Sequence, residues 1–238
     1  MMEPITLAQA ARSLGLSPGR VRALAVQGQL PAAKIGDRWL VERSAVERRR
    51  REGSHEGRRF SSQNAWALIS LASGEGVEGI DPSVRSRLKR ALALEGLEKL
   101  RPRLAQRAEI LSFRAHPGEI SYLLEDPELV RSGISAAGER EFGLVSGREA
   151  DGYLPKSKAK KFLASHALEP AGLEGNVRLR LVPKEAWRFL QGRPAAPRAA
   201  VALDLAEEPD PRSAKAGRRV LREVDDHHRQ ARRKHHKP

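Results

Sequence analysis

The sequence predicts an α+β fold: a small N-terminal winged helix-turn-helix, a linker, a larger mixed α/β body and a basic, disordered C-terminal tail. Three observations support this prediction. Two short helical patterns of apolar residues and a compact hairpin pattern occupy the first fifty residues. Helical and strand-like segments are mixed along the rest of the chain. Most of the excess positive charge lies at the two ends.

The composition excludes several classes of protein. The 238 residues suffice for one large domain or two small ones. The chain has no cysteine, which excludes disulfides, thiolate zinc sites and cysteine nucleophiles and favours a reducing compartment. Neither a signal peptide nor an apolar stretch long enough to cross a bilayer is visible. We therefore expect a cytoplasmic protein with no membrane partner.

The net charge of +14 is unevenly distributed. Residues 1–59 carry 12 basic and 6 acidic side chains, and residues 212–238 carry 10 and 3. Residues 60–211 carry 22 and 21, which makes this stretch nearly neutral. Basic ends predict a polyanion as partner, because each Lys or Arg that meets a phosphate releases a condensed counterion.

Two short helices are predicted at the N-terminus. Thr6 can cap the first, and Gly15 ends it. Ser17 can cap the second, which has Pro18 at its first position and closes at Gly28. The first helix has its apolar face at Leu7, Ala10, Ala11 and Leu14; the second turns Val21, Leu24 and Ala25 inward and Gly19, Arg20, Arg22 and Ala23 outward.

A hairpin and a third helix follow. Residues 32–35 and 38–41 read as short strands joined at Gly36-Asp37, and we expect Trp39 to pack this wing onto the helices. Ser44 can cap a helix that runs into the arginines at 48–51. These arginines either contact phosphates or form a solvated helix end before the linker; both interpretations stay open.

This segment resembles the excisionase and MerR-like winged helix-turn-helix family. The resemblance implies that the helix from Ser17 reads the major groove of double-stranded DNA, while the wing reaches the backbone or the minor groove. The predicted DNA-binding residues are Ser17, Arg20, Arg22, Lys34, Arg38, Arg48 and Arg49. The matching stretches are Ile5-Thr6-Leu7-Ala8-Gln9-Ala10-Ala11, Leu14-Gly15-Leu16-Ser17-Pro18, Val21-Arg22, Gly28-Gln29-Leu30-Pro31-Ala32 and Lys34-Ile35-Gly36-Asp37-Arg38-Trp39.

We predict a DNA-binding domain at 1–51, a linker at 52–59, an α+β regulatory or protein-interaction domain at 60–224 and a basic tail at 225–238. Within the larger domain, 109–115, 152–154 and 176–182 read as strands. Helices are expected from Phe60, from Pro82, at 119–124, 126–133 and 156–166, from Pro183 and from Ser213, with a surface loop at 135–141.

Signals for catalysis are weak, and we expect no catalytic residue, no metal site and no cofactor. The chain has no phosphate-binding glycine loop, no HExxH and no GxSxG. Acidic residues gather between Asp204 and Asp210, where a solvated helix end and a turn are a better explanation than a metal site. The histidine pairs at 227–228 and 235–236 lie in a tail that is a poor setting for a closed metal site.

The C-terminal region resembles the end of AbiEi-type antitoxins. The similar segments are 175–183, 196–205, 210–213 and the final helix. This resemblance implies a repressor of its own operon, paired with a nucleotidyltransferase-like toxin, and it implies no catalytic residue.

The leading hypothesis is a sequence-specific DNA-binding transcriptional regulator, in particular a repressor or an antitoxin. A single small module buries little surface, so we expect a homodimer or pairs of monomers on repeated half-sites. One alternative is an excisionase-like factor that bends DNA. Another is a metal-dependent enzyme acting on nucleic acid through the carboxylates near 204–210. A ligand-sensing regulator is a further alternative.

Overall fold

The structure is a computed structural model. It describes residues 4–26, 30–36, 38–51, 59–138, 142–144, 148–171 and 175–235, without the side chains of residues 35, 38, 48–51 and 231–235. The chain divides into two compact units, Met1–Arg58 and Arg59–Pro238, which we call unit 1 and unit 2. Each is described by itself. No helix in the described ranges is long and apolar enough to cross a membrane.

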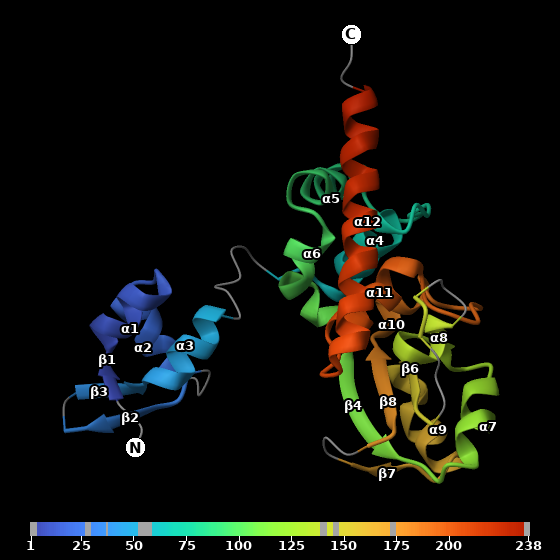
Figure 1. Ribbon diagram of the computed structural model, residues 1–238, viewed down its shortest axis with the longest axis horizontal. Coiled ribbons are helices and arrows are strands. Elements are labelled where there is room, and N and C mark those ends of the chain that lie inside the picture. The colour runs from blue at the N-terminus through green and yellow to red at the C-terminus, as the bar shows by residue number, and fades with distance from the viewer. Residues whose placement is uncertain are drawn as a thin grey trace. The chain divides into compact units, whose positions relative to one another are not determined.

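Unit 1 consists of three helices and a three-stranded sheet (Figure 1). The central strand β3 pairs antiparallel with both β1 and β2. Ile5 and Val41 lie opposite each other in the sheet and are buried against the helices. The elements are β1 (Pro4–Thr6), α1 (Leu7–Leu14), α2 (Pro18–Val26), β2 (Ala32–Ile35), β3 (Arg38–Glu42) and α3 (Arg43–Arg51).

The predicted starts of the first two helices are confirmed. Thr6 caps α1 through a capping box, in which its hydroxyl accepts from the Gln9 N–H and the Gln9 side chain accepts from the Thr6 N–H. Gly15 ends α1 with a left-handed φ of 65°. Ser17 caps α2, because its hydroxyl accepts from the Arg20 N–H at 3.2 Å. Val21, Leu24 and Ala25 are buried as predicted.

Two features of unit 1 differ from the prediction. Strand β1 was not expected, since three residues are too few to show an alternating pattern. Ser44 does not cap α3, because the helix already begins at Arg43 and the Ser44 hydroxyl donates to the Glu42 carboxylate instead. The predicted stop at Gly28 lies outside the described residues.

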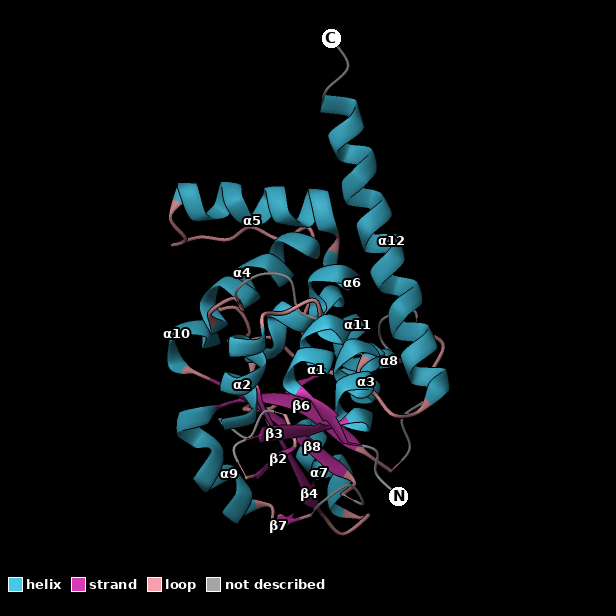
Figure 2. Cartoon of the chain, turned by 90° about the vertical axis from the view of Figure 1, so that its left-hand side faces the viewer, coloured by secondary structure: helices cyan, strands magenta, loops and turns pink. Residues whose placement is uncertain are grey.

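Unit 2 is a mixed sheet with helices on both faces (Figure 2). The strand order is β5-β6-β8-β4-β7; β6 and β8 run parallel and the other neighbours antiparallel. Its helices are α4 (Ser62–Ala72), α5 (Pro82–Glu95), α6 (Leu97–Leu100), η1 (Arg101–Arg107), α7 (Glu119–Glu125), α8 (Gly133–Ala137), η2 (Lys156–Lys158), α9 (Ala159–Ser165), α10 (Lys184–Trp187), α11 (Arg198–Ala206) and α12 (Pro211–His235). Its strands are β4 (Glu109–Arg114), β5 (Val130–Arg131), β6 (Ala150–Pro155), β7 (Glu169–Pro170) and β8 (Val177–Val182).

Unit 2 has two apolar cores, one on each face of the sheet. Leu179 and Leu181 of β8 pack with Leu123 of α7 and Phe162 of α9 on one face. Helices α4 and α11 belong to the larger core, which includes Val182 at the end of β8. The alternation in β8 therefore sends its leucines to one face and its arginines, Arg178 and Arg180, to the other.

Three predictions for unit 2 need correction. The helix expected at 126–133 is strand β5 followed by the start of α8, because Val130 pairs with Tyr153 of β6. The surface loop expected at 135–141 is the end of helix α8 as far as Ala137; Ala136 and Ala137 are buried, and residues 139–141 lie outside the described part. Asp204 is not on a solvated helix end, because it is fully buried within α11.

The last helix extends further than predicted. The sequence pattern suggested a helix from Ser213 to Val224 and a disordered tail from residue 225, but α12 continues to His235. Asp225 explains part of this extension: its carboxylate accepts from the Leu97 and Glu98 N–H groups at the start of α6. His228, one turn on, lies 3.2 Å from the Ala72 carbonyl of α4.

Candidate nucleic-acid interface

Helix α2 presents an unusual outer face to solvent. At 100° per residue, Gly19, Ala23 and Val26 occupy the side opposite the buried residues Val21 and Leu24. Gly19 and Val26 are exposed, the latter by 65%, and Ala23 is half-buried. Small side chains on this side keep the helix slender where it is furthest from the core. A helix of this shape can approach the base edges of a DNA groove closely.

Arg20 and Arg22 flank this slender face on its two sides. Both are exposed, and the helical repeat places them about 160° apart around the axis. Residues two apart on a helix do not face each other, so the pair cannot form one patch. Both arginines point to solvent as predicted, and they lie on opposite flanks of the helix.

The wing carries the second set of predicted contacts. Lys34 of β2 lies opposite Trp39 of β3, and Lys34 is exposed while Trp39 is half-buried. Because strand residues alternate, Trp39 shares a sheet face with the buried Val41. Gly36 opens the turn with a φ of 59°, a conformation that favours glycine.

Three of the predicted residues have undescribed side chains. Arg38 is paired in register with Ile35, and Arg48 and Arg49 lie in α3, but their side chains fall outside the described part. The structure therefore places Ser17 at the start of α2, Arg20 and Arg22 on the two flanks of this helix, and Lys34 on the hairpin that follows. Val26 was not among the predicted residues, because an exposed valine at a helix end gives no sequence signal.

Comparison with known protein families agrees with this geometry. Residues 5–54 match the helix-turn-helix domain family. Unit 1 is thus a helix-turn-helix DNA-binding domain, with α1 as its first helix and α2 as its second. Comparisons of the chain with curated proteins and with solved structures found no match.

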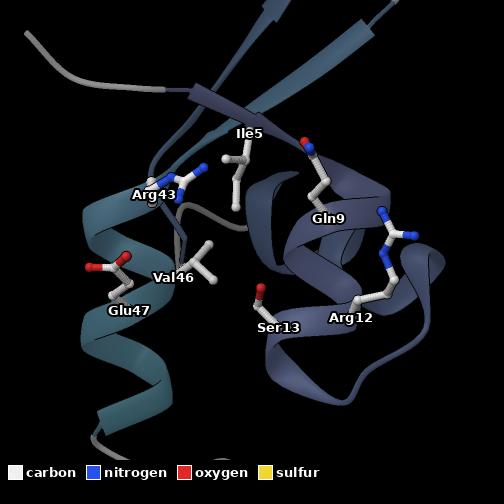
Figure 3. Close-up of a pocket in the computed structure, with 7 residues that line it drawn as sticks. All are labelled: Ile5, Gln9, Arg12, Ser13, Arg43, Val46 and Glu47. Carbon is white, nitrogen blue, oxygen red and sulfur yellow. The ribbon is translucent and has the colours of Figure 1, made fainter.

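The helix-turn-helix domain also has a hollow between α1 and α3, shown in Figure 3. Its volume is about 330 Å³, and both signs of charge line it: Arg12 from α1, and Arg43 and Glu47 from α3. Because a carboxylate is among the groups that line it, this hollow is less suited to a phosphate than the arginines of α2. Ile5, Gln9, Ser13 and Val46 complete its lining.

Unit 2 contains a buried ionic network centred on Asp204. This side chain is fully buried, and its two carboxylate oxygens accept from Arg107 at 2.9 Å, Tyr153 at 2.9 Å and Ser132 at 2.5 Å. Arg180 Nε lies 3.3 Å from the same carboxylate. The network joins α11 to η1 and to the parallel strands β6 and β8.

The outer members of this network are also paired. Arg180 binds Asp151 through two hydrogen bonds of 2.9 and 2.7 Å, and Arg107 binds Glu207. Arg178 pairs with Glu208. Burial alone raises the pKa of Asp204, but Arg180 and Arg107 hold this pKa below its usual value. The Asp204 carboxylate therefore stays charged, and both of its oxygens already accept hydrogen bonds within the protein.

The acidic residues between Asp204 and Asp210, which stood out in the sequence, have protein partners in the structure. Asp204 pairs with Arg107 and Arg180, Glu207 pairs with Arg107, and Glu208 pairs with Arg178 and Arg180. Asp210 caps α12 by accepting from the Ser213 N–H at 2.7 Å. Among the described residues, no group of three or more His, Asp or Glu side chains could hold a metal ion. Asp204, Glu207 and Glu208 are arranged around arginines instead.

Proposed function

We propose that this protein is a sequence-specific transcriptional repressor whose reading element is α2. One observation carries the proposal: α2 combines a slender outer face at Gly19 and Ala23 with exposed arginines on both flanks. The major groove is about 12 Å wide and admits one helix. A helix that turns its slender face to the floor of this groove keeps Arg20 and Arg22 on its two flanks, from which their long side chains reach base edges on either side. Arginine recognises guanine by two hydrogen bonds in this setting.

The wing supplies a second contact in the proposal. Lys34 projects from the hairpin as an exposed cation and suits a backbone phosphate, which fixes register without reading sequence. Val26, exposed at the C-terminal end of α2, can contact a thymine methyl group. Sequence preference then comes from α2, whereas the wing sets position.

The experiment is a binding titration with the full chain. Duplexes are first selected from a randomised library, and the preference for a selected over a scrambled duplex is measured by fluorescence anisotropy. R20A/R22A removes two contacts worth about 1 to 3 kcal/mol each, so we expect this preference to fall at least about thirty-fold.

R12A/R43A is the matched control, since it removes the same charge from unit 1 outside α2. This variant should keep its sequence preference. An unchanged preference in R20A/R22A, or failure of the full chain to enrich any duplex, would show that the proposed function is wrong.

Tight binding to a specific DNA site also predicts how many copies of the protein bind. One module of this size buries too little surface for tight specific binding, so we propose a homodimer or adjacent copies on repeated half-sites. Sedimentation of the full chain with a selected duplex measures the number of copies bound. Two copies per duplex support this arrangement, and one copy contradicts it.

The resemblance of 175–183 and 196–205 to AbiEi-type antitoxins supports one further role, binding of a nucleotidyltransferase-like toxin by unit 2. These residues form β8 and α11, which the ionic network joins. Co-expression with a nucleotidyltransferase encoded by a neighbouring gene tests this role. A stable complex and restored growth support it, and growth arrest despite co-expression contradicts it.

A further inference from the structure

Helix α12 runs along the outside of unit 2, and its C-terminal end projects beyond the other elements of that unit (Figures 1 and 2). Its inner side packs tightly: Val220, Leu221 and Val224 are buried in the larger core. The rest of its circumference is exposed and carries most of the positive charge at this end of the chain. The exposed surface has two flanks that differ in chemistry.

One of them, which we call the basic flank, consists of Lys215, Arg218 and Arg222. Their spacing of three and four residues aligns them on one side of the helix over about 10 Å. All three are exposed, and within the described ranges none of them forms an ion pair with a carboxylate. The Arg222 Nε donates to the backbone carbonyl of Arg218, which holds the Arg222 side chain along this side of the helix.

The neighbouring flank of α12 contains a carboxylate, that of Glu223, beside Arg219. Its carboxylate pairs with Arg198 of α11 at 2.6 Å and lies 3.7 Å from Arg219. Cations on this side already have a protein partner. Glu223 thus partly compensates the arginines of this flank, whereas the cations of the basic flank have no carboxylate partner among the described residues.

The basic flank borders a hollow of about 430 Å³ at the start of α12. Glu208, Pro209, Pro211 and Ala214 complete the lining. Glu208 is the carboxylate of this hollow, and it is already paired with Arg178. The free charge around the hollow is therefore positive, which suits an anionic group that is not part of this chain.

We propose that the basic flank is a second DNA-contacting surface, which grips backbone phosphates of the duplex that the helix-turn-helix domain reads. This inference rests on the proposed function, because a duplex bound by unit 1 is held close to unit 2 by the chain itself. A duplex carries one phosphate charge per about 1.7 Å of its axis, so the 10 Å length of the flank matches several phosphates. Charge complementarity and this tethering favour DNA over an acidic protein surface.

Phosphate contacts have a signature that separates them from base contacts. They read no sequence, so losing them weakens the selected and the scrambled duplex equally. Each contact contributes about 0.9 to the slope of log affinity against log salt. Two lost contacts lower the slope by about 1.8, which corresponds to a loss of up to about 60-fold at 0.1 M salt.

The test compares two double variants of the full chain on both duplexes across a salt series. R218Q/R222Q removes two charges from the basic flank, and R198Q/R219Q removes two from the flank paired with Glu223. We expect the slope to fall by about 1.8 in the first and by less than half of that in the second. R218K/R222K keeps the charge and should keep the slope, which separates loss of charge from loss of arginine packing.

Outcomes for the two proposals are distinct. If R20A/R22A destroys sequence preference while R218Q/R222Q has the wild-type salt slope, the repressor proposal stands and the basic flank is not a DNA surface. Binding of an acidic protein to this flank gives the same wild-type slope and overturns the inference. Equal losses in R218Q/R222Q and R198Q/R219Q also overturn it, because they reflect only net charge.

Discussion

Replacing Asp204 by Asn tests whether the buried network holds unit 2 together. The substitution keeps the shape of the side chain but turns an acceptor oxygen into an NH₂ group that faces arginine and hydroxyl donors. Arg107, Tyr153 and Ser132 all donate to Asp204, and Arg180 lies 3.3 Å away. At least one donor therefore loses its acceptor inside the core.

The expected loss of stability depends on the ion pairs that remain in D204N. Breaking a buried ion pair by removing one partner destabilises by about 3 to 5 kcal/mol. In D204N, Arg107 keeps Glu207 and Arg180 keeps its two bonds to Asp151, so neither arginine is left without a carboxylate. We therefore expect a loss near the lower limit, about 3 kcal/mol in the free energy of unfolding of unit 2.

The assay is urea unfolding of the full chain in a Trp39→Phe background, where the remaining tryptophans, Trp66 and Trp187, both lie in unit 2. Trp66 is a direct reporter, because it donates to the Arg107 carbonyl at 2.9 Å and contacts the Tyr153 ring. D210N is the matched control; Asn caps helices as well as Asp, so its stability should change by less than about 0.5 kcal/mol. Equal stability of D204N and the parent protein would refute the structural role, and a carboxylate reserved for metal chemistry predicts that equality.

Three further predictions concern the same helices and carboxylates. Because the folded-state pKa of Asp204 is lowered, the stabilisation by its carboxylate is present at neutral pH and is lost as the pH falls through that pKa. In urea unfolding, the stability difference between D204N and the parent protein should therefore shrink below about pH 4. A difference that grows there would contradict this prediction. Gly217→Ala should lower the thermal midpoint, because a Cβ there meets the backbone nitrogen of Ala206 and pushes α11 and α12 apart, which costs about 1 to 3 kcal/mol. Gly19→Ala, with open space around its Cβ, should not lower it. Ser17→Ala removes the cap of α2 and should destabilise unit 1 by about 1 kcal/mol, whereas Ser17→Asn should not. The measurement is thermal unfolding followed by the part of the tryptophan fluorescence that a Trp39→Phe variant lacks.

Local patterns were sufficient to predict the helix-turn-helix domain. Its helices begin and end at residues whose own side chains or backbone do the capping, as at Thr6, Gly15 and Ser17. The hairpin at 32–41 is closed by neighbours in sequence. The strand β1 was missed because it exists only through its partner β3, which lies more than thirty residues away.

In unit 2, the prediction failed wherever distant segments decide the structure. Asp204 has the sequence context of a solvated helix end, yet it is buried because Arg107 and Arg180 arrive from segments 97 and 24 residues away in the chain. The extension of α12 past Val224 depends likewise on Asp225 meeting the start of α6, 128 residues earlier. Neither pairing leaves a periodic signal in the sequence.

The near neutrality of residues 60–211 does not show where their charges lie. The charges of Arg107 and Arg180 are compensated inside unit 2 by Asp151, Asp204 and Glu207. These two arginines therefore add little to the electrostatic potential at the surface. Helix α5 shows the opposite case, since Arg85, Arg87, Lys89 and Arg90 are all exposed. Net charge per segment thus averages buried, compensated arginines with exposed ones. The quantity that matters for a polyanion is the exposed charge without a protein partner, and on α12 this quantity singles out the basic flank.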